Sequence, residues 1–307
     1  MQSSRTGDTT KTPTGLALYT HAAERSSREV IAAYSTSFGL ASRLLGKRIQ
    51  QDVYNIYALV RVADEIVDGS AEEARLQSAT GAGNGQIDPG KLLDQLEAET
   101  YLAMRSGFST NLVVHAFAHT ANRVGFGKEL VQPFFASMRM DLTQHEHDEQ
   151  SFKDYVYGSA EVVGLMCLKA FVLGQSYTDD QHRQMIASAR ALGSAFQKVN
   201  FLRDLAADFK ALGRSYFPGV SVSNFDEESK RRIVVDIQQE LDTSAKGLRL
   251  LPKDARKAVV AAQLLFEALN TRLNKTAAAE LTVTRIRVPN PQKLWIAVKA
   301  WIGVTPR

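Results

Sequence analysis

The stretch RVADEIVDGS at residues 61–70 places three carboxylates within five residues, beside Ile66 and Val67 in a run with the pattern of a buried helix. A carboxylate in apolar surroundings is costly unless it meets a cation, a metal ion or a proton. On a helix, residues four apart project from one face about 6 Å from each other, so Asp64 and Asp68 form a like-charged pair. Any fold of this chain must therefore bring positive charge to that face.

A second acidic pair with the same spacing lies far along the chain. The segment FQKVNFLRDLAADF carries Asp204 and Asp208, with Asn200 one turn earlier and Arg203 adjacent. Facing helices of a bundle commonly build metal sites from inward carboxylates. Oxygen ligands without His or Cys favour a hard cation, most plausibly Mg²⁺, which keeps waters and binds substrate phosphates. A diphosphate bridged by Mg²⁺ between the pairs, with Arg61 and Arg203 on its other oxygens, would satisfy both clusters.

Composition and periodicity predict an all-α fold. The chain has 307 residues, 44% of them hydrophobic, and only 20 Gly and 8 Pro. These values suit a large helical core. Apolar residues recur at helical spacing over the ranges 17–45, 51–67, 91–140 (with breaks near Gly107, Gly125–Gly127 and Pro133), 179–209, 227–248 and 252–273. We expect one domain over residues 16–307, a bundle of long helices around a central cavity, after a disordered polar tail at 1–15.

Two segments need separate treatment. Residues 69–90 are rich in Gly and predict a flexible loop beside the site. Residues 151–174 contain β-branched and aromatic residues, but their length and period favour a core helix over a strand.

Several classes of protein are disfavoured. The net charge of +4 is small and no nucleic-acid motif accompanies it. The single Cys167 suggests a reducing compartment and a buried, inert thiol. No signal-peptide core and no apolar run of membrane-spanning length is visible, so we expect a cytoplasmic protein. His115 with His119, and the HEHDE segment at 145–149, lack the further ligands of a zinc site and predict helix surface or solvated loop.

Four segments together resemble the squalene/phytoene synthase family, and bacterial phytoene synthases most closely. They occur in the family's order and spacing: YSTSF (34–38), YALVRVADEIVD (57–68), YVYGSAEVVGLM (155–166) and QKVNFLRDLAADFKALGRSYFP (197–218). The resemblance implies an isoprenoid synthase fold and a Mg²⁺-dependent prenyltransferase, with Mn²⁺ as an alternative ion. It implies prenyl diphosphate substrates and leaves protein partners unknown.

The same resemblance assigns roles to individual residues. The metal ligands would be Asp64, Asp68, Asn200, Asp204 and Asp208. Diphosphate contacts would come from Arg61, Gln197 and Arg203, and the first helix would line the site through Ser35, Ser37 and Phe38. Tyr57 and Tyr155 would sit near the reacting carbons and, with Phe38, offer π faces to an allylic cation.

The family reaction joins two prenyl diphosphates head to head through a cyclopropylcarbinyl diphosphate. No G-x-G-x-x-G fingerprint for a nicotinamide cofactor is present, which disfavours reductive squalene formation and favours phytoene from geranylgeranyl diphosphate. Ser42, one turn beyond Phe38, would leave room for a longer tail. A dehydrosqualene or squalene-type synthase using farnesyl diphosphate stays open, as does a non-catalytic helical assembly protein. A head-to-tail elongation enzyme is disfavoured, because it usually carries D-D-x-x-D pairs.

Three features depart from the family or stand outside its motifs. Glu161 replaces a family glycine, which puts a close backbone approach in doubt, and Leu265 and Phe266 stand where relatives often carry a diphosphate-contacting Tyr. The C-terminal segment combines Trp295 with several basic residues. It predicts a final helix packed on the bundle, with peripheral contact to the inner face of the cell membrane as the alternative.

Overall fold

The computed structural model describes residues 13–35, 41–79, 87–212 and 215–301, and only the backbone at 72, 76–79, 207–212, 290, 291, 294 and 301. The helical elements are α1 (Gly15–Tyr34), α3 (Lys47–Asp68), α4 (Ser70–Ala79), α5 (Pro89–Ser106), α6 (Leu112–Val124), α7 (Lys128–Thr143), α8 (Glu149–Val156), the π-helix η1 (Tyr157–Glu161), α9 (Val162–Val172), α10 (Asp179–Leu212), α11 (Glu227–Ala245), the 3₁₀-helix η2 (Leu248–Leu250), α12 (Lys253–Lys275), α13 (Ala278–Leu281) and α14 (Asn290–Trp301). Within these ranges the β structure is limited to an isolated parallel bridge between Glu146 and Ser215. The all-α prediction is confirmed.

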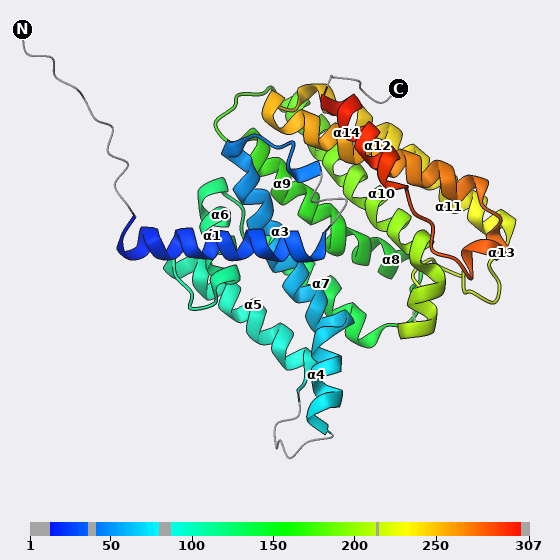
Figure 1. The fold of residues 1–307 in the computed structure, drawn as a ribbon, viewed down its shortest axis with the longest axis horizontal. Coiled ribbons are helices and arrows are strands. Elements are labelled where there is room, and N and C mark those ends of the chain that lie inside the picture. The colour runs from blue at the N-terminus through cyan, green and yellow to red at the C-terminus, as the bar shows by residue number, and fades with distance from the viewer. Residues whose placement is uncertain (1–12, 36–40, 80–86, 213–214, 302–307) are drawn as a thin grey trace, which may run out of the picture.

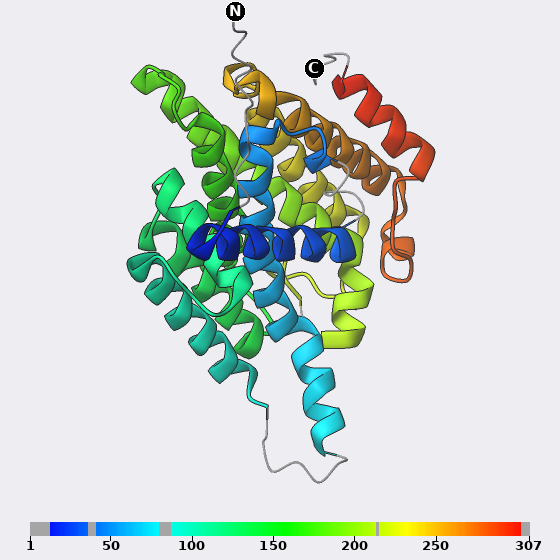
Figure 2. The same cartoon turned by 60° about the vertical axis from the view of Figure 1, so that its left-hand side comes forward.

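The helices form two groups joined through a central run. On one side α1 and α5–α7 pack around α3, and on the other α11 and α12 pack on α10, with α14 lying against α12 (Figures 1 and 2). The run α8–η1–α9 lies between them, because α9 packs against both α3 and α10. Three apolar clusters fill the bundle, and the largest buried side chains include Phe117, Phe134 and Phe135. The two helices with acidic pairs therefore flank one shared core element.

The central run is also the one segment among the described residues long and apolar enough to cross a membrane. It covers Glu149–Val172, and 44% of its most apolar 18-residue stretch is buried inside the fold. Burial of this kind is found in core helices, which pass the same test of length and composition. The prediction of a core helix over 151–174, rather than a strand, agrees with this structure.

Local signals explain most helix ends. Asp88 caps α5 by accepting a hydrogen bond from the Lys91 backbone N–H, and a Pro starts the first turn. Gly107 and Gly125 close α5 and α6 with φ of 77° and 81°, a left-handed conformation that glycine adopts without steric cost. The predicted breaks at these two glycines are thus correct.

Three predicted boundaries are wrong. α7 continues through Pro133, because one missing N–H removes a single bond from a helix that is otherwise anchored by tertiary packing. Ser70–Ala79 forms helix α4 rather than loop, since SAEEARLQSA consists largely of good helix formers and lies between Gly69 and Gly81 with no glycine of its own. The first helix ends at Tyr34 and does not run to Leu45. Of the predicted tail at 1–15, residues 1–12 lie outside the described residues and α1 already begins at Gly15.

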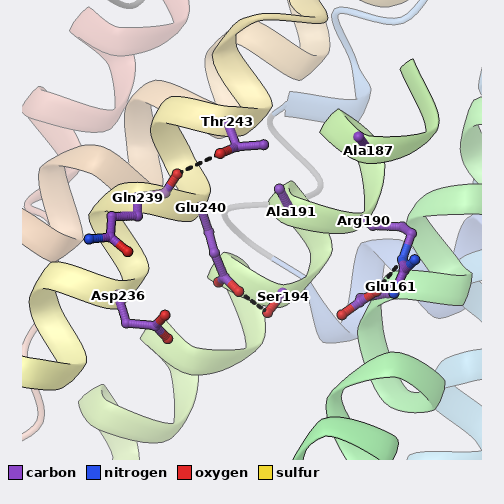
Figure 3. A pocket seen from close by; sticks show the side chains of 9 residues that line it. All are labelled: Glu161, Ala187, Arg190, Ala191, Ser194, Asp236, Gln239, Glu240 and Thr243. Atoms are coloured by element: carbon purple, nitrogen blue, oxygen red, sulfur yellow. Dashed lines mark hydrogen bonds and ion pairs between the residues drawn. The ribbon is translucent and has the colours of Figure 1, made fainter. Parts of the chain in front are cut away.

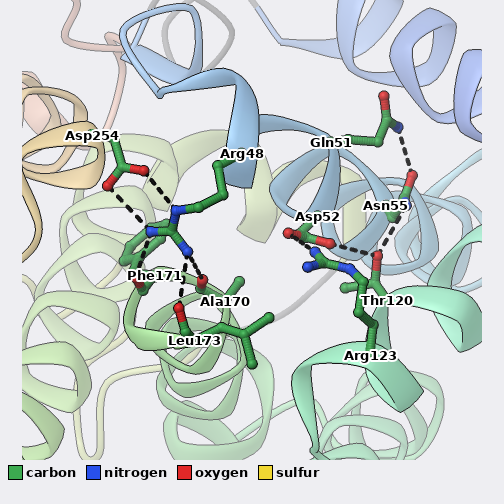
Figure 4. A network of polar contacts seen from close by, with 10 residues as sticks. All are labelled: Arg48, Gln51, Asp52, Asn55, Thr120, Arg123, Ala170, Phe171, Leu173 and Asp254. Carbon is green, nitrogen blue, oxygen red and sulfur yellow. Dashed lines mark hydrogen bonds and ion pairs between the residues drawn. The ribbon is translucent and has the colours of Figure 1, made fainter. Parts of the chain in front are cut away.

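A guanidinium fixes the end of α9 to α3 and α12. Arg48 Nε donates to Asp254 Oδ2 at 2.8 Å, and Arg48 Nη2 donates to the Phe171 carbonyl at 2.8 Å (Figure 4). Its Nη1 also reaches the Leu173 carbonyl at 3.2 Å. The last carbonyls of a helix have no partner inside the helix, so this arginine satisfies them and aligns three elements.

A second polar network ties α3 to α6. Thr120 donates to Asp52 Oδ1 at 3.1 Å, and Asn55 donates to Thr120 at 3.0 Å (Figure 4). Arg123 forms an ion pair with Asp52, and Gln51 donates to Asn55 at 2.8 Å. These contacts set the rotation of α3 and hence the face on which its acidic pair stands.

The π-helix η1 packs backbone to backbone against both neighbours. A Cβ added at Gly158 would lie 2.1 Å from the Pro133 carbonyl oxygen of α7, and one added at Gly193 of α10 would lie 2.7 Å from the Ala160 carbonyl oxygen. The glycine that allows η1 to approach α10 closely is therefore Gly193 on α10, and no glycine is needed at position 161 of η1. The Glu161 side chain is largely buried, with 15% of it exposed, and pairs with Arg190 Nε of α10 at 2.6 Å.

Replacing Gly158 with Ala should lower the free energy of unfolding by about 1–3 kcal/mol, because the new methyl group forces α7 and η1 apart. Denaturant unfolding with circular dichroism measures this. The matched control is Ser159→Ala, whose hydroxyl is buried with no hydrogen-bond partner in the described structure, and which should leave stability unchanged or slightly higher. Equal losses in the two variants would contradict the packing argument.

Candidate functional site

The first acidic pair stands at the C-terminal end of α3. Asp64 is partly buried, and its pKa is raised to about 8, mainly by desolvation and then by the negative charge of Asp68. The charge of Arg61 opposes this rise, and that of Asp141 on α7 adds to it. Among the described residues, the positive charge of Arg61 therefore does not offset the desolvation of Asp64 and the charges of its two neighbouring carboxylates.

Arg61 is held in place beside the pair. It forms an ion pair with Glu65, and its guanidinium lies 4.4 Å from the centre of the Tyr34 ring. Its Nε is buried and has no hydrogen-bond partner in the described structure. A buried N–H without an acceptor is unfavourable, so this arginine is prepared for an anionic ligand.

The end of α1 meets the same face of α3. The Ser35 and Tyr57 side chains share a hydrogen bond, which lowers the pKa of Tyr57, while burial, the larger effect, raises it. The charges of Arg61 and Asp64 also act on Tyr57. The structure thus brings together four predicted site residues from two segments.

The second acidic pair begins with a carboxylate clamped by two arginines. Arg203 Nε lies 3.0 Å from Asp204 Oδ1, and Arg203 Nη2 lies 2.5 Å from Oδ2. From the segment after α13, Arg285 Nε lies 2.6 Å from Oδ1 and Nη2 lies 3.1 Å from Oδ2. Asp204 is therefore neutralised by protein, unlike Asp64.

Tyr155 connects the two pairs. Its hydroxyl donates to Asp141 at 2.9 Å, and its ring centre lies 5.8 Å from that of Phe201, one turn before Asp204 on α10. The pKa of Tyr155 is raised well above its ordinary value, mainly by desolvation and then by the charge of Asp141, with a smaller effect from Asp68. Tyr155 therefore feels the charge of Asp68 in the first acidic pair and contacts α10, the helix that carries the second pair.

The other predicted residues divide into three groups. Gln197 and Asn200 are partly buried on α10, two turns and one turn before Asp204, on one face of the helix. The Asp208 side chain and residues Ser37 and Phe38 lie outside the described residues. Ser42 is buried, and its carbonyl accepts from Gln50 Nε2 at 3.0 Å, so its role in chain length stays a prediction.

Asp141, Tyr216 and Arg285 lie near the site but were not among the predicted site residues, and two histidines differ from their predicted exposure. Asp141 and His147 are 5% and 7% exposed, so the expectation that HEHDE is solvated is wrong for His147. His115 is likewise buried and bonded to Thr20 at 2.9 Å, not at the helix surface. Asp141 carried a detectable signal, since it follows the apolar positions Phe134 and Met138 at helical spacing. Tyr216 and Arg285 had no local signal, because their contacts depend on the tertiary fold.

Leu265 and Phe266, which stand where relatives often carry a diphosphate-contacting Tyr, lie on α12. Phe266 stacks on Phe196 of α10 with ring centres 3.6 Å apart, and Leu265 is buried. An apolar contact between α10 and α12 therefore occupies this position.

The described residues supply only part of the oxygen ligands that Mg²⁺ needs, so they fit this ion only if substrate phosphates supply others. No three His, Cys, Asp or Glu side chains among them are grouped so that they could hold a metal ion. Mg²⁺ is commonly bound by one or two carboxylates plus waters and substrate phosphates. Asp64 with Asp68, and Asp204 with Asn200, offer this partial set, and the partnerless Arg61 Nε indicates the missing anion.

A separate pocket of about 350 Å³ lies between α10, α11 and η1 (Figure 3). Its wall carries the Glu161–Arg190 pair, and Ser194 donates to Glu240 at 2.6 Å. Lys198 bridges Glu240 and Asp236 at 2.7 and 2.5 Å. Its described charged groups thus pair with one another, unlike the first acidic pair.

Comparisons with known proteins agree on one family. The family model described as squalene/phytoene synthase matches residues 31–292. The chain is 27% identical over 266 residues to 15-cis-phytoene synthase of a Paracoccus species, covering 81% of each chain. It is 27% identical over 294 residues to 15-cis-phytoene synthase of Enterobacter agglomerans, covering 87% of this chain and 90% of the relative.

Solved structures show the same fold. A dehydrosqualene synthase in complex with ligand superposes with a TM-score of 0.73 at 21% identity, covering 92% of this chain and 96% of the other. A squalene synthase from Alicyclobacillus acidocaldarius gives 0.68 at 21% identity, covering 83% and 94%.

In metal-free protein, Asp64 should make stability fall as the pH rises. Its pKa is about 8 when folded and 3.8 as the ordinary value, so the folded state binds more protons between these limits. The stabilisation is full below about pH 4 and is lost as the pH rises to about 8, by up to about 1.4 kcal/mol per pH unit.

Denaturant unfolding in EDTA at several pH values, for wild type and Asp64→Asn, measures this effect. The asparagine variant keeps the size of the side chain but does not titrate, so its stability should decline less with pH. Identical pH dependence in both proteins would show that folding does not raise the pKa of Asp64.

Proposed function

This chain belongs to the squalene/phytoene synthase family, and we propose that it joins two geranylgeranyl diphosphates head to head to give phytoene and two diphosphates. The reaction would pass through a cyclopropylcarbinyl diphosphate. The curated relatives named above as phytoene synthases support this product, as does the lack of a nicotinamide fingerprint in the sequence. The enzyme is then a prenyltransferase of carotenoid biosynthesis.

The observation that carries the proposal is the unbalanced charge at the end of α3. Asp64 has a pKa near 8 beside Asp68, and the buried Nε of Arg61 finds no acceptor among the described residues. Bound cations would return Asp64 to its ionised form, and a diphosphate oxygen would accept from Arg61. A ligand that carries both is a metal–diphosphate complex.

The residues of the chain have distinct tasks in this reaction. Arg61 and Arg203 would bind phosphate oxygens and stabilise the charge that grows on the departing diphosphate. When bound, Mg²⁺ supplies Lewis acidity to the same leaving group, and Mn²⁺ accepts the same oxygen ligands. The rings of Tyr57 and Tyr155 would face the allylic cation, and the surrounding apolar helices would exclude water from it.

Incubation of the purified protein with Mg²⁺ and geranylgeranyl or farnesyl diphosphate, followed by mass analysis of the hydrocarbons, tests the function. We expect a 40-carbon product, and a loss of about 100-fold or more in rate for Asp64→Ala and Asp204→Ala. The control is Asp180→Asn, an exposed carboxylate on the same helix as Asp204, which should retain full activity. A 30-carbon product would indicate dehydrosqualene synthesis, and no hydrocarbon from either substrate would favour a non-catalytic protein.

Arg285 should act as a further diphosphate-side cation. Its guanidinium already contacts Asp204, so ions bound at that carboxylate would leave it free for phosphate oxygens. We expect Arg285→Ala to lower kcat/KM by about 10- to 100-fold, the value of one charge-assisted hydrogen bond. Arg287→Ala, two residues away and exposed, is the matched control. Equal effects in the two variants would contradict a specific role.

We also propose that α14 rests on the inner face of the cell membrane. Trp295 and Val298 are 56% and 38% exposed and three residues apart, and Lys299 Nζ lies 5.7 Å from the Trp295 ring centre. An exposed Trp flanked by basic residues suits an anionic bilayer surface. The lipid-soluble product would benefit from this contact.

Sedimentation with anionic and neutral vesicles tests the membrane contact. Trp295→Ala should weaken binding to anionic vesicles, whereas Val235→Ala, an exposed apolar residue on α11, should not. Unchanged binding in both variants would place any membrane contact elsewhere.

A further inference from the structure

A buried carboxylate lies behind the site without belonging to either acidic pair. Asp141 is 5% exposed on α7, and both of its oxygens lie 2.9 Å from the Tyr155 hydroxyl. The Tyr216 hydroxyl lies 3.5 Å from its Oδ1. An ionised carboxylate at such a position needs hydrogen bonds to be tolerated, and the shorter of these bonds comes from Tyr155.

The surrounding chain holds this tyrosine rigidly. The bridge between Glu146 and Ser215, with Ser215 N donating to the His145 carbonyl at 2.8 Å, brings the segment before α8 beside the segment after α10. Tyr216 consequently stacks on Phe201 with ring centres 3.9 Å apart.

The rings around Tyr155 complete its support. Tyr155 lies 5.4 Å from Tyr216 and 5.0 Å from His147, measured between ring centres. Its backbone carbonyl also accepts from Ser137 of α7 at 3.0 Å. Both the ring and the hydroxyl of Tyr155 are therefore fixed by protein contacts.

A phenol that donates to a buried carboxylate has two chemical properties. Its proton is committed to that bond, so its oxygen is a poor acceptor for another proton. The adjacent negative charge also pushes electron density into the ring, which strengthens the attraction of the ring face for a cation.

We propose that Asp141 is a positioning residue for the head-to-head condensation, which acts by holding Tyr155 as a neutral, oriented and electron-rich ring beside the allylic cation. This inference rests on the function proposed above, whereas the contact between the two residues does not. Two protons and two diphosphates are lost when two geranylgeranyl diphosphates become phytoene. Since Tyr155 keeps its own proton, each lost proton passes to a diphosphate oxygen, which gains charge as its C–O bond breaks.

A double-mutant cycle tests whether Asp141 acts through Tyr155. Asp141→Asn keeps the size and one acceptor oxygen but removes the charge, and should lower kcat by about 10- to 100-fold with KM for geranylgeranyl diphosphate nearly unchanged. In a Tyr155→Phe background the same substitution should cause little further loss. Tyr216→Phe, which removes the longer hydrogen bond, should reduce kcat only slightly. Additive effects of Asp141→Asn and Tyr155→Phe, or a change in KM alone, would overturn the proposal.

A second measurement uses the folded wild-type protein and no substrate. With tyrosines labelled with ¹³C at Cζ, the resonance that disappears in Tyr155→Phe should not titrate over the range near pH 10 where an unperturbed tyrosine ionises. If that resonance titrates over this range, the contact with Asp141 does not hold the proton and the proposal fails. A wild type that makes no hydrocarbon would reject the proposed function and the catalytic role of Asp141 together, while this experiment would still decide the contact itself.

Discussion

The structure depends on the cost of placing carboxylates in an apolar helix bundle. α3 must turn its apolar residues toward the core and, at its last turn, bring Asp64 and Asp68 to the same region. Burial in the bundle, and then the negative charge of Asp68, raise the pKa of Asp64 to about 8. Much of the local architecture, including Arg61 on the ring of Tyr34 and the hydrogen bond between Ser35 and Tyr57, can be understood as support for this charged face.

The two acidic pairs differ in how many arginines contact their carboxylates. Asp204 receives two guanidinium groups, from Arg203 and from Arg285 after α13. Asp64 has Arg61 nearby, but that arginine is already paired with Glu65. Among the described residues, the first pair therefore has less positive charge around it than the second, and the buried Nε of Arg61 finds no acceptor among them.

How far the sequence predicts the molecule depends on the range of the interactions. The helices and the acidic pairs follow from local spacing, so α3, α10 and the residues Asp64 and Asp204 were identified from the sequence. The contacts of Arg285 and Tyr216 join segments far apart in the chain, and only the folded structure reveals them. Asp141 is intermediate: it occupies an apolar position of α7, so the reasoning applied to Asp64 would also have singled it out.

The surroundings of Glu161 show how η1 packs closely on α10 although this residue departs from the family pattern. Close packing of η1 on α10 requires a residue without a side chain, but only on one of the two helices. Here Gly193 of α10 supplies it opposite the Ala160 carbonyl, and Gly158 does the same toward α7. Position 161 can then carry a carboxylate that points to Arg190, on a pocket wall away from the acidic pairs. The π-helix keeps both neighbours close, and Tyr155 at the preceding turn stays in register with Asp141 and Phe201.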